Sequence, residues 1–445
     1  AELGVQTDYH DVQGGHHRAD PAALAHVVAM LEADREAAAA VPRVGPPLHL
    51  HGPLVIDAEV TSATIGLAGT PHPVEMHLDR GRSKIVLPDG LHDGCHVLEY
   101  DTDRGPGETV VVVAPPRMPR SERFAGQGGL FVPTYALWEA DRPLPSFRHL
   151  HDLARTLERS GVAVVSTLPL YATFLDQPFD PSPYSPISRL HWNEIYLDDD
   201  CLPDAPVPDQ GSVVDWRTLA RRRRDQLVEA ARSADTELMS QLSTFVAANP
   251  DVGAYARFLA AREAGGDEIV ERSHVLAQFL ADRQLRAIAD DHDAAALALD
   301  LPIGSSPDGF EVWADPGMFA AGATVGAPPD SFFADGQNWG FPPPLPAAMR
   351  ASGHRLWRQL IARVGRYADI VRIDHAMAIE RLWWVPDGFS AHQGVYVQYP
   401  REELLAVIAA SAAAAGVTIV GEDLGTVPVE VSDAFERWDV LGMYE

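Results

Sequence analysis

Residues 369–375 read Asp-Ile-Val-Arg-Ile-Asp-His, an apolar strand that ends in charged side chains, and this stretch decides the fold class. Val371 and Ile373 supply apolar positions, whereas Arg372 and Asp374 share the opposite parity and therefore one face of the strand. An Arg two residues before an Asp on one face can keep the carboxylate ionised, as a nucleophile requires. The pattern fits equally well a structural Arg–Asp pair that only fixes the strand end.

A second strand of this kind is found at residues 417–425, which read Val-Thr-Ile-Val-Gly-Glu-Asp-Leu-Gly. Carboxylates at the end of a buried hydrophobic strand lose hydration energy unless they are paired or have a function. This favours a function for Glu422. Asp423 could instead cap the following helix. Carboxylates at the ends of two such strands, Asp374 and Glu422, can lie on either side of a glycosidic bond and perform a double displacement.

Short apolar runs recur after residue 128 and alternate with amphipathic stretches, which is typical of a parallel α/β architecture. In barrels and open sheets alike, the chemistry lies at the carboxyl ends of parallel strands. The predicted strands span 130–137, 162–168, 294–303, 369–374 and 417–420, with a possible further strand from Leu441.

The part of the chain before residue 128 has a different pattern. Helical character at 20–40 is followed by period-two runs separated by Gly- and Pro-bearing turns, which predict a small β-sandwich. We therefore predict an N-terminal helical segment (1–45), a β-sandwich (46–115), a linker (116–128) and a barrel region (129–445) with a helical insertion at about 212–290.

The composition narrows the function classes. The 445 residues are 46% hydrophobic and 22% charged, which fits a globular chain of two or three domains. The net charge of −28 argues against nucleic acid, which needs clustered Lys and Arg, but does not disfavour a neutral polyhydroxylated ligand. Cys95 and Cys201 are too few for a disulfide framework, and no apolar run reaches the roughly 18–20 residues of a membrane span. A cytoplasmic protein is expected.

Two charged runs also need an interpretation. Residues 221–224 are four consecutive arginines, and we interpret them as solvated helix surface. Residues 198–200 are three consecutive aspartates without the turn glycine of a Ca²⁺ loop, and we interpret them as a solvated loop. Because no pattern indicates a metal, a nucleotide or a flavin, no cofactor is predicted.

Seven motifs follow one another in a fixed order from about residue 128 to the end. They are Ser-Pro-Tyr-Ser-Pro at 182–186, Asn-Glu-Ile-Tyr-Leu-Asp at 193–198, Asp-Leu-Pro-Ile-Gly at 300–304, Gly-Ala-Pro-Pro-Asp at 326–330, Gly-Gln-Asn-Trp-Gly at 336–340, Val-Arg-Ile-Asp-His at 371–375 and Gly-Glu-Asp-Leu-Gly at 421–425. Together they resemble the 4-α-glucanotransferases (amylomaltases, or disproportionating enzymes) of glycoside hydrolase family 77. The Trp-Gly-Phe-Pro-Pro sequence at 339–343 resembles the longer bacterial branch, which carries extra N-terminal domains.

The resemblance implies an activity and a role for each matched residue. It implies transfer of α-1,4-glucan segments between maltooligosaccharides with retention, with Asp374 as the nucleophile that forms a covalent glucosyl ester and Glu422 as the general acid/base. The implied substrate contacts are Arg372 and His375 beside the nucleophile, Tyr184 and Ser185 at the cleavage site, Asp300 at the donor sugar, and Gln337 and Trp339 in a loop over the acceptor side.

The segment 326–344 is rich in Gly and Pro and is a candidate lid. Transfer and hydrolysis share the same covalent intermediate, so a lid that excludes water favours transfer.

The chain departs from the family pattern after Glu422. The family uses a third carboxylate, an Asp preceded by His near the end of the seventh strand, and no later residue matches it. The predicted fold is a (β/α)8 barrel of the TIM type that is truncated after about six strands. We expect the sequence to be part of a longer natural protein; a shortened relative that has lost catalysis is the alternative.

Two other functions remain open at this point. The chain could be an α-glucan hydrolase of the wider α-amylase clan, which product analysis would distinguish from a transferase. It could also be a non-catalytic glucan-binding protein, an alternative that the missing third carboxylate keeps open. In each case the expected partner is a maltooligosaccharide or an α-1,4-glucan rather than a nucleic acid or a membrane.

Overall fold

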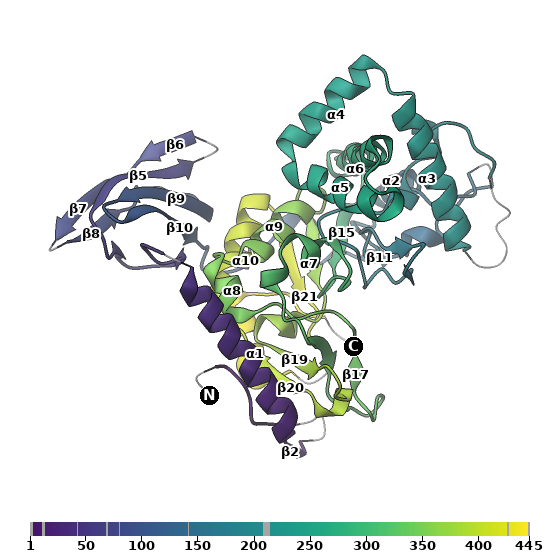
Figure 1. Ribbon diagram of the computed structural model, residues 1–445. Coiled ribbons are helices and arrows are strands. Elements are labelled where there is room, and N and C mark those ends of the chain that lie inside the picture. Colours follow the sequence, from purple (N-terminus) through teal and green to yellow (C-terminus); the bar gives the residue numbers. More distant parts are fainter. Residues whose placement is uncertain are drawn as a thin grey trace. The chain divides into compact units, whose positions relative to one another are not determined.

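The computed structural model describes residues 3–10, 14–41, 43–67, 70–79, 81–140, 142–207, 214–424 and 427–443 (Figure 1). The chain divides into two compact units. The first unit comprises Ala1–Arg120, Asp315–Gly365 and Ile373–Glu445, and the second comprises Ser121–Ala314 and Arg366–Arg372.

A parallel sheet forms the centre of the second unit. Strand β12 (Val164–Ser166) pairs with β11 (Gly129–Phe131) on one side and with β15 (Ala296–Leu301) on the other, and β18 (Ile370–Ile373) follows β15 in the sheet. All six residues of β15 are buried, as expected for a strand covered on both faces. The boundary between the units falls within β18, between Arg372 and Ile373.

Two helices of the second unit pack on this sheet, and the others extend from them as a helical region. Helices α2 and α6 pack against β12 and β15, and α6 also packs against α3, α4 and α5. The short strands β13 (Phe174–Leu175) and β14 (Phe179–Asp180) form a hairpin. The helices are α2 (Phe147–Arg159), α3 (Trp216–Arg232), α4 (Thr236–Ala248), α5 (Pro250–Ala264), α6 (Glu268–Ala289) and α7 (Phe310–Ala314).

The architecture is therefore α/β, but the described strands do not close into the predicted (β/α)8 barrel. Strand β11 is the edge of the sheet, and its three residues are exposed. Leu130 and Phe131 are 42% and 57% exposed, because no described strand pairs with this edge.

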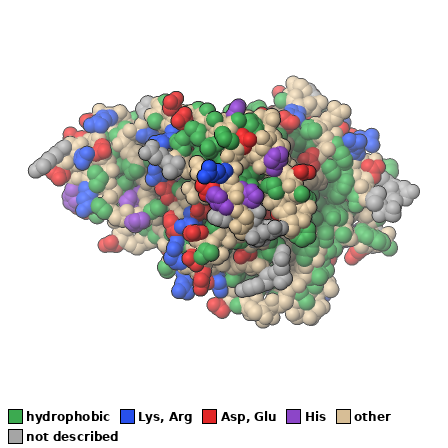
Figure 2. All heavy atoms as spheres, turned by 90° about the horizontal axis from the view of Figure 1, so that it is seen from below, with side chains coloured by type: hydrophobic (Ala, Val, Ile, Leu, Met, Phe, Trp, Pro, Cys, Tyr) green, Lys and Arg blue, Asp and Glu red, His purple; other side chains and the backbone are tan. Residues whose placement is uncertain are grey.

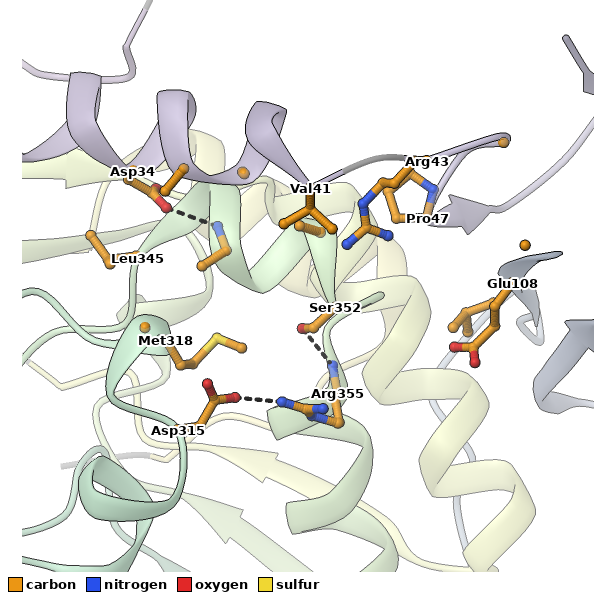
Figure 3. A pocket seen from close by; sticks show the side chains of 18 of the residues that line it. Asp34, Val41, Arg43, Pro47, Glu108, Asp315, Met318, Leu345, Ser352 and Arg355 are labelled. Atoms are coloured by element: carbon orange, nitrogen blue, oxygen red, sulfur yellow. Dashed lines mark hydrogen bonds and ion pairs between the residues drawn. The ribbon is translucent and has the colours of Figure 1, made fainter. Parts of the chain in front are cut away.

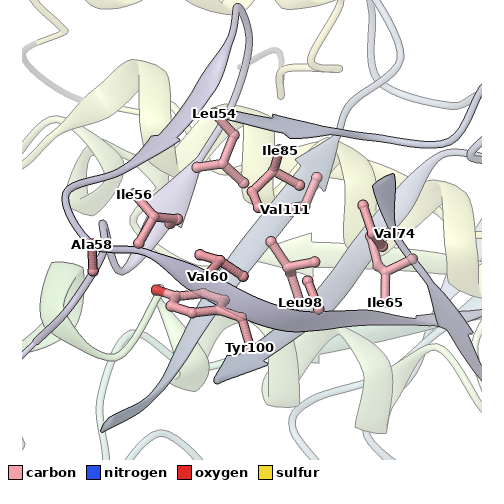
Figure 4. Close-up of a cluster of buried hydrophobic side chains, with 11 residues drawn as sticks. Leu54, Ile56, Ala58, Val60, Ile65, Val74, Ile85, Leu98, Tyr100 and Val111 are labelled. Carbon is pink, nitrogen blue, oxygen red and sulfur yellow. The ribbon is translucent and has the colours of Figure 1, made fainter. Parts of the chain in front are cut away.

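In the first unit, two sheets pack into a β-sandwich (Figure 4). Side chains of alternating parity, among them Ile65, Leu98 and Tyr100, point into the core between the sheets. One sheet has the order β3 (Leu48–His49), β10 (Gly105–Val113), β9 (Gly94–Thr102), β5 (Val60–Leu67) and β6 (Thr70–Pro73), and the other β4 (Leu54–Ile56), β8 (Arg82–Val86) and β7 (Glu75–Asp79).

The rest of the first unit combines an antiparallel sheet with five longer helices. Val110 and Val112 of β10 pack against Ala406, Val407 and Ala410 of α10. The sheet has the order β17 (Gln337–Asn338), β16 (Ala323–Ala327), β19 (Arg381–Pro386) and β20 (Val395–Gln398). The other elements are β1 (Asp8–His10), β2 (His16–Arg18), α1 (Pro21–Ala40), α8 (Pro346–Ala351), α9 (Arg355–Val364), α10 (Arg401–Ala415), β21 (Thr418–Gly421) and α11 (Val429–Trp438).

The charges on the surface are mixed. On the face shown in Figure 2, basic side chains are scattered among acidic ones instead of forming one continuous patch. Among the described residues, none of the helices combines the length and the apolar composition needed to cross a bilayer.

The charged runs at 198–200 and 221–224 are less solvated than the sequence predicts. Arg222 and Arg223 are 9% and 1% exposed, and both donate to Asp199, with Nη–Oδ distances of 2.7–2.9 Å. These contacts lower the pKa of the Asp199 carboxyl although desolvation opposes the change. The interpretation of residues 221–224 as solvated helix surface is therefore wrong for Arg222 and Arg223. Both are buried because Asp199, from the aspartate run, pairs with them.

Candidate functional site

One group of predicted site residues lies in the second unit around Asp300. This carboxylate, near the end of β15, is only 4% exposed. Its Oδ1 accepts a hydrogen bond from Nη1 of Arg372 at 2.6 Å, and its Oδ2 accepts one from the Tyr184 hydroxyl at 2.7 Å. The two donors fix the orientation of the carboxylate, and charge-assisted hydrogen bonds of this kind are the stronger class.

The turn before Tyr184 holds its backbone in place. The backbone N–H of Tyr184 donates to Oγ of Ser182 at 3.3 Å, and the backbone N–H of Ser185 donates to the Ser182 carbonyl at 3.1 Å. Ser185 therefore follows Tyr184 directly within a hydrogen-bonded turn. Both residues are partly buried, which leaves part of their surface open to a ligand.

The sequence analysis did not identify the ion pair that supports the segment after Asp300. Arg189 and Glu311 are 4% and 5% exposed, and their Nη2 and Oε2 atoms are 2.7 Å apart. Nη1 of Arg189 also donates to the Ile303 carbonyl at 2.7 Å. The pair thus ties α7 to the residues that follow β15. None of the seven motifs contains Arg189 or Glu311. The two residues lie 122 positions apart in the sequence and are brought together only by the fold.

A second group lies in the first unit, around Glu422, which directly follows β21. The Glu422 N–H donates to the Ile373 carbonyl at 2.9 Å, and the Ala376 N–H donates to the Glu422 carbonyl at 2.9 Å. The Glu422 carboxylate accepts from two backbone N–H groups, that of His375 at 2.9 Å and that of Leu424 at 3.1 Å. Glu422 is therefore bonded to both residues that flank Asp374, namely Ile373 and His375.

The segment around Asp374 leaves the strand in a tight turn. His375 has a left-handed backbone, with φ +44°, and a short 3₁₀ helix (Ala376–Ile379) begins directly after it. Asp374 is partly buried at the carboxyl end of β18. Desolvation, together with the nearby charge of Arg381, lowers the pKa of His375 to about 4, so its imidazole is neutral at pH 7.

Gln337 and Trp339, the two predicted loop residues, are connected to the group around Glu422 by the contact between Trp339 and His375. The Trp339 ring contacts the His375 ring edge-on, with centroids 5.0 Å apart, and its Nε1 donates to Oε1 of Gln337 at 3.3 Å. Gln337 lies in β17, paired with Ala327. Gly326 allows this pairing, because a Cβ atom there would lie 2.0 Å from the Gln337 carbonyl oxygen.

Gly421, the last residue of β21, and Asp423, which follows Glu422, have structural contacts. Oδ1 of Asp423 accepts from the Met443 N–H at 2.8 Å, and α11 begins only at Val429, so Asp423 does not cap that helix. Gly421 packs closely, because a Cβ atom there would meet Cβ of Ala376 at 3.0 Å. Gly425, the last residue of the predicted motif, lies outside the described residues.

Most of the predicted site residues thus fall into two groups, the first joined by hydrogen bonds and the second by hydrogen bonds and one ring contact. In the second unit, Tyr184 and Arg372 are bonded to Asp300; in the first unit, Gln337 and Trp339 lead to His375, and His375 to Glu422. Along the chain, Arg372 of one group and Asp374 of the other are separated by Ile373 alone. Among the described residues, no cluster of three or more His, Cys, Asp or Glu side chains is placed to hold a metal ion.

Comparison with known proteins places this chain in a family. The family model of glycoside hydrolase family 77, 4-alpha-glucanotransferase, matches residues 132–272 and 268–444. The 4-alpha-glucanotransferase of Mycobacterium tuberculosis is 30% identical over 421 residues, which cover 81% of this chain and 58% of that protein. The one from Haemophilus influenzae is 39% identical over 171 residues, or 38% of this chain and 24% of that protein. The chain therefore spans a little over half the length of the mycobacterial relative.

Two solved structures have a similar fold. The amylomaltase from Corynebacterium glutamicum superimposes with a TM-score of 0.80 at 23% identity, over 99% of this chain and 74% of that chain. The amylomaltase from Streptococcus agalactiae in complex with acarbose gives a TM-score of 0.63 at 22% identity, over 71% and 72% of the two chains. Both support the α/β fold, and the resemblance found through the seven motifs is confirmed. The chain belongs to glycoside hydrolase family 77, the family of the 4-alpha-glucanotransferases.

Proposed function

We propose that this chain carries the catalytic groups of a 4-α-glucanotransferase that moves α-1,4-glucan segments between maltooligosaccharides. The observation that supports this proposal best is the connection between the two catalytic candidates. Glu422 is hydrogen-bonded to Ile373 and His375, the two neighbours of Asp374, so two acids lie on adjacent backbone segments. Family membership supplies the reaction class, and the two carboxylates supply its chemistry.

In the proposed reaction the glucan is transferred in two displacements. An oxygen of Asp374 attacks the anomeric carbon and forms an ester, while the glycosidic C–O bond breaks and Glu422 gives its proton to the departing 4-oxygen. An acceptor sugar then enters, Glu422 takes the proton of its 4-hydroxyl, and the new C–O bond displaces Asp374.

Glu422 must change its contacts during this cycle. In the structure both of its carboxylate oxygens accept from backbone N–H groups. A carboxyl group that donates a proton to a leaving oxygen must turn at least one oxygen toward the substrate. We propose that sugar binding beside His375 provides the drive for this rotation.

The remaining residues are proposed to bind the sugar. Asp300, held by Arg372 and Tyr184, is suited to accept hydrogen bonds from donor-sugar hydroxyls, and the Tyr184 ring offers an apolar face. The loop with Gln337 and Trp339 is proposed to cover the acceptor side and exclude water, which favours transfer over hydrolysis.

We further propose that the open sheet belongs to a (β/α)8 barrel in the whole protein. Leu130 and Phe131 on the edge strand β11 are exposed, which is unfavourable for an unpaired strand edge. The mycobacterial relative is also considerably longer than this chain. In this proposal residues 46–115 serve as a supporting β-sandwich and residues 129–445 carry the site.

Incubation with maltotriose tests the activity. We expect a series of longer maltooligosaccharides together with glucose, and we expect Asp374→Asn and Glu422→Gln to reduce their formation by at least about a thousandfold. Asp387→Asn, an exposed carboxylate of the same unit, is the control and should act like the wild type. Release of glucose and maltose alone would favour a hydrolase, and maltotriose binding without turnover would favour a glucan-binding protein.

A further inference from the structure

Helix α8 is capped by a side chain from a distant part of the chain. Its own N-cap residue, Leu345, provides no side-chain hydrogen bond to the helix. Asp34 of α1 supplies it instead: Oδ2 accepts from the Ala347 N–H at 2.7 Å and Oδ1 from the Ala348 N–H at 3.0 Å. In Figure 3 the Asp34 side chain points away from α1, and a dashed line joins its carboxylate to a backbone nitrogen. Asp34 also lines a cavity of about 1330 Å³. The cap joins residues that are 313 positions apart.

The segment before α8 is the C-terminal half of the candidate substrate loop, and we name residues 339–345 the returning limb. The limb is bonded along its length to residues 318–325. The Trp339 N–H donates to the Val325 carbonyl at 2.9 Å and the Val325 N–H to the Phe341 carbonyl at 2.7 Å. Further along, the Ala320 N–H donates to the Pro343 carbonyl at 2.9 Å and the Leu345 N–H to the Met318 carbonyl at 2.8 Å.

The two ends of the returning limb have different partners. At its start, the Trp339 ring contacts His375 of the candidate site. At its end, the Tyr399 hydroxyl donates to the Pro344 carbonyl at 2.7 Å, and Pro346 begins α8 directly after Leu345. Because α8 follows Leu345 directly, the position of α8 fixes the end of the limb together with the bonds to Met318 and Tyr399.

Asp34 lies where a carboxylate is costly. It is 6% exposed, and desolvation raises its pKa, whereas the two amide hydrogen bonds act in the opposite direction. A buried carboxylate of this kind is tolerated only when its hydrogen bonds are made. Loss of the side chain would leave the two amides at the start of α8 without a partner and would loosen the helix start.

We propose that Asp34 is a positioning residue for the substrate loop: by capping α8 it fixes the returning limb and thereby holds Trp339 against His375. Helix α1 precedes the residues matched by the family model, which begin at 132. The inference therefore assigns to this N-terminal helix a part in sugar recognition. The effect on activity, called the activity arm, rests on the proposed function. The effect on the position of the loop, called the structural arm, does not.

Hydrogen–deuterium exchange tests the structural arm with the full chain. In Asp34→Ala we expect peptides from residues 327–351 to exchange about fivefold faster than in the wild type, in line with the usual effect of a lost cap. Asp34→Asn keeps one acceptor oxygen but turns its NH2 toward the other amide, so its exchange should lie between that of the wild type and that of Asp34→Ala. Asp267→Ala is the matched control, because Asp267 caps α6 through two amides, those of Ile269 and Val270, in the second unit.

Two exchange results would overturn the proposal: unchanged protection of residues 327–351 in Asp34→Ala, or equally faster exchange in the β-sandwich core, which would mean that Asp34 acts on overall folding. With maltotriose, Asp34→Ala should raise KM about fivefold and change kcat by less than about twofold, and Asp34→Asn, which keeps one acceptor oxygen, should give an intermediate KM. An equal fall of kcat in both variants would contradict the positioning role. If the wild type shows no transfer at all, the proposed function fails and the exchange result still decides the structural arm.

Discussion

The buried ion pair between Arg189 and Glu311 allows a quantitative prediction. Replacing Glu311 by Leu removes the partner of a guanidinium that is 4% exposed. Removing one member of a buried pair leaves an uncompensated charge and typically costs about 3–5 kcal/mol. We therefore expect Glu311→Leu to lower the free energy of unfolding of the second unit by about 4 kcal/mol.

A double variant separates the uncompensated charge from other effects. Arg189→Met in the Glu311→Leu background removes the charge, but it leaves the carbonyls of Pro302 and Ile303 without their donor. Because an unsatisfied buried acceptor costs about 1–3 kcal/mol, the double variant should be less stable than the wild type but more stable than the single variant.

Urea unfolding followed by circular dichroism at 222 nm is a suitable assay. The signal at this wavelength comes mainly from helices, and the second unit contains the long helices α2 to α6. For a slope of about 3 kcal/mol/M, a loss of 4 kcal/mol shifts the midpoint by about 1.3 M. Glu229→Leu is the control, because its pair with Arg232 is exposed and should contribute less than about 1 kcal/mol. A double variant no more stable than Glu311→Leu would refute the reasoning.

Three further predictions concern the candidate site. Gly326→Ala should displace β17 and reduce transfer at least tenfold, whereas Gly317→Ala, where a Cβ atom meets nothing within 4 Å, should leave transfer rates unchanged. Because the pKa of His375 is lowered in the folded chain, the unfolded chain binds a proton at this residue at a higher pH than the folded chain does. The contribution of neutral His375 to stability should therefore fall by up to roughly 3 kcal/mol between pH 6.5 and pH 4. His375→Gln should flatten that part of a pH–stability curve, and an unchanged curve would contradict the assignment. Tyr184→Phe removes the hydrogen bond to Asp300 and should lower kcat/KM for maltotriose about tenfold; a change of less than twofold would show that the hydroxyl does not orient the carboxylate.

The sequence locates the strands well and their ends less well. The apolar runs at 294–303 and 369–374 contain β15 and β18, because a buried parallel strand needs such a run. Only two residues of the run at 130–137 are strand, because β11 spans Gly129–Phe131. Pro133 has no N–H for the ladder and precedes a 3₁₀ turn at Thr134–Ala136. The closed barrel depends on strand partners that the described residues do not provide.

Partners that are distant in sequence are the part that could not be predicted. The structure pairs Arg372 with Asp300, 72 positions earlier, a contact between two strands that the pattern of residues 369–375 does not indicate. The arginines at 222–223 bond an aspartate 23 or 24 positions before them. Parity and period describe a single strand or helix and contain no information on which elements meet. The catalytic roles of Asp374 and Glu422 stay a prediction.

The division of the first unit into three stretches of chain has a consequence for biosynthesis. Val110 of β10 packs against Val407 and Ala410 of α10, so this part of the core cannot form until some 300 further residues have been made. The second unit is nearly continuous, from Ser121 to Ala314, and lacks only Arg366–Arg372. During synthesis its helices can therefore pack while the β-sandwich still waits for its partner helix, with apolar side chains of β10 exposed. Chaperone binding should accordingly concentrate on β10 in nascent chains that end before α10.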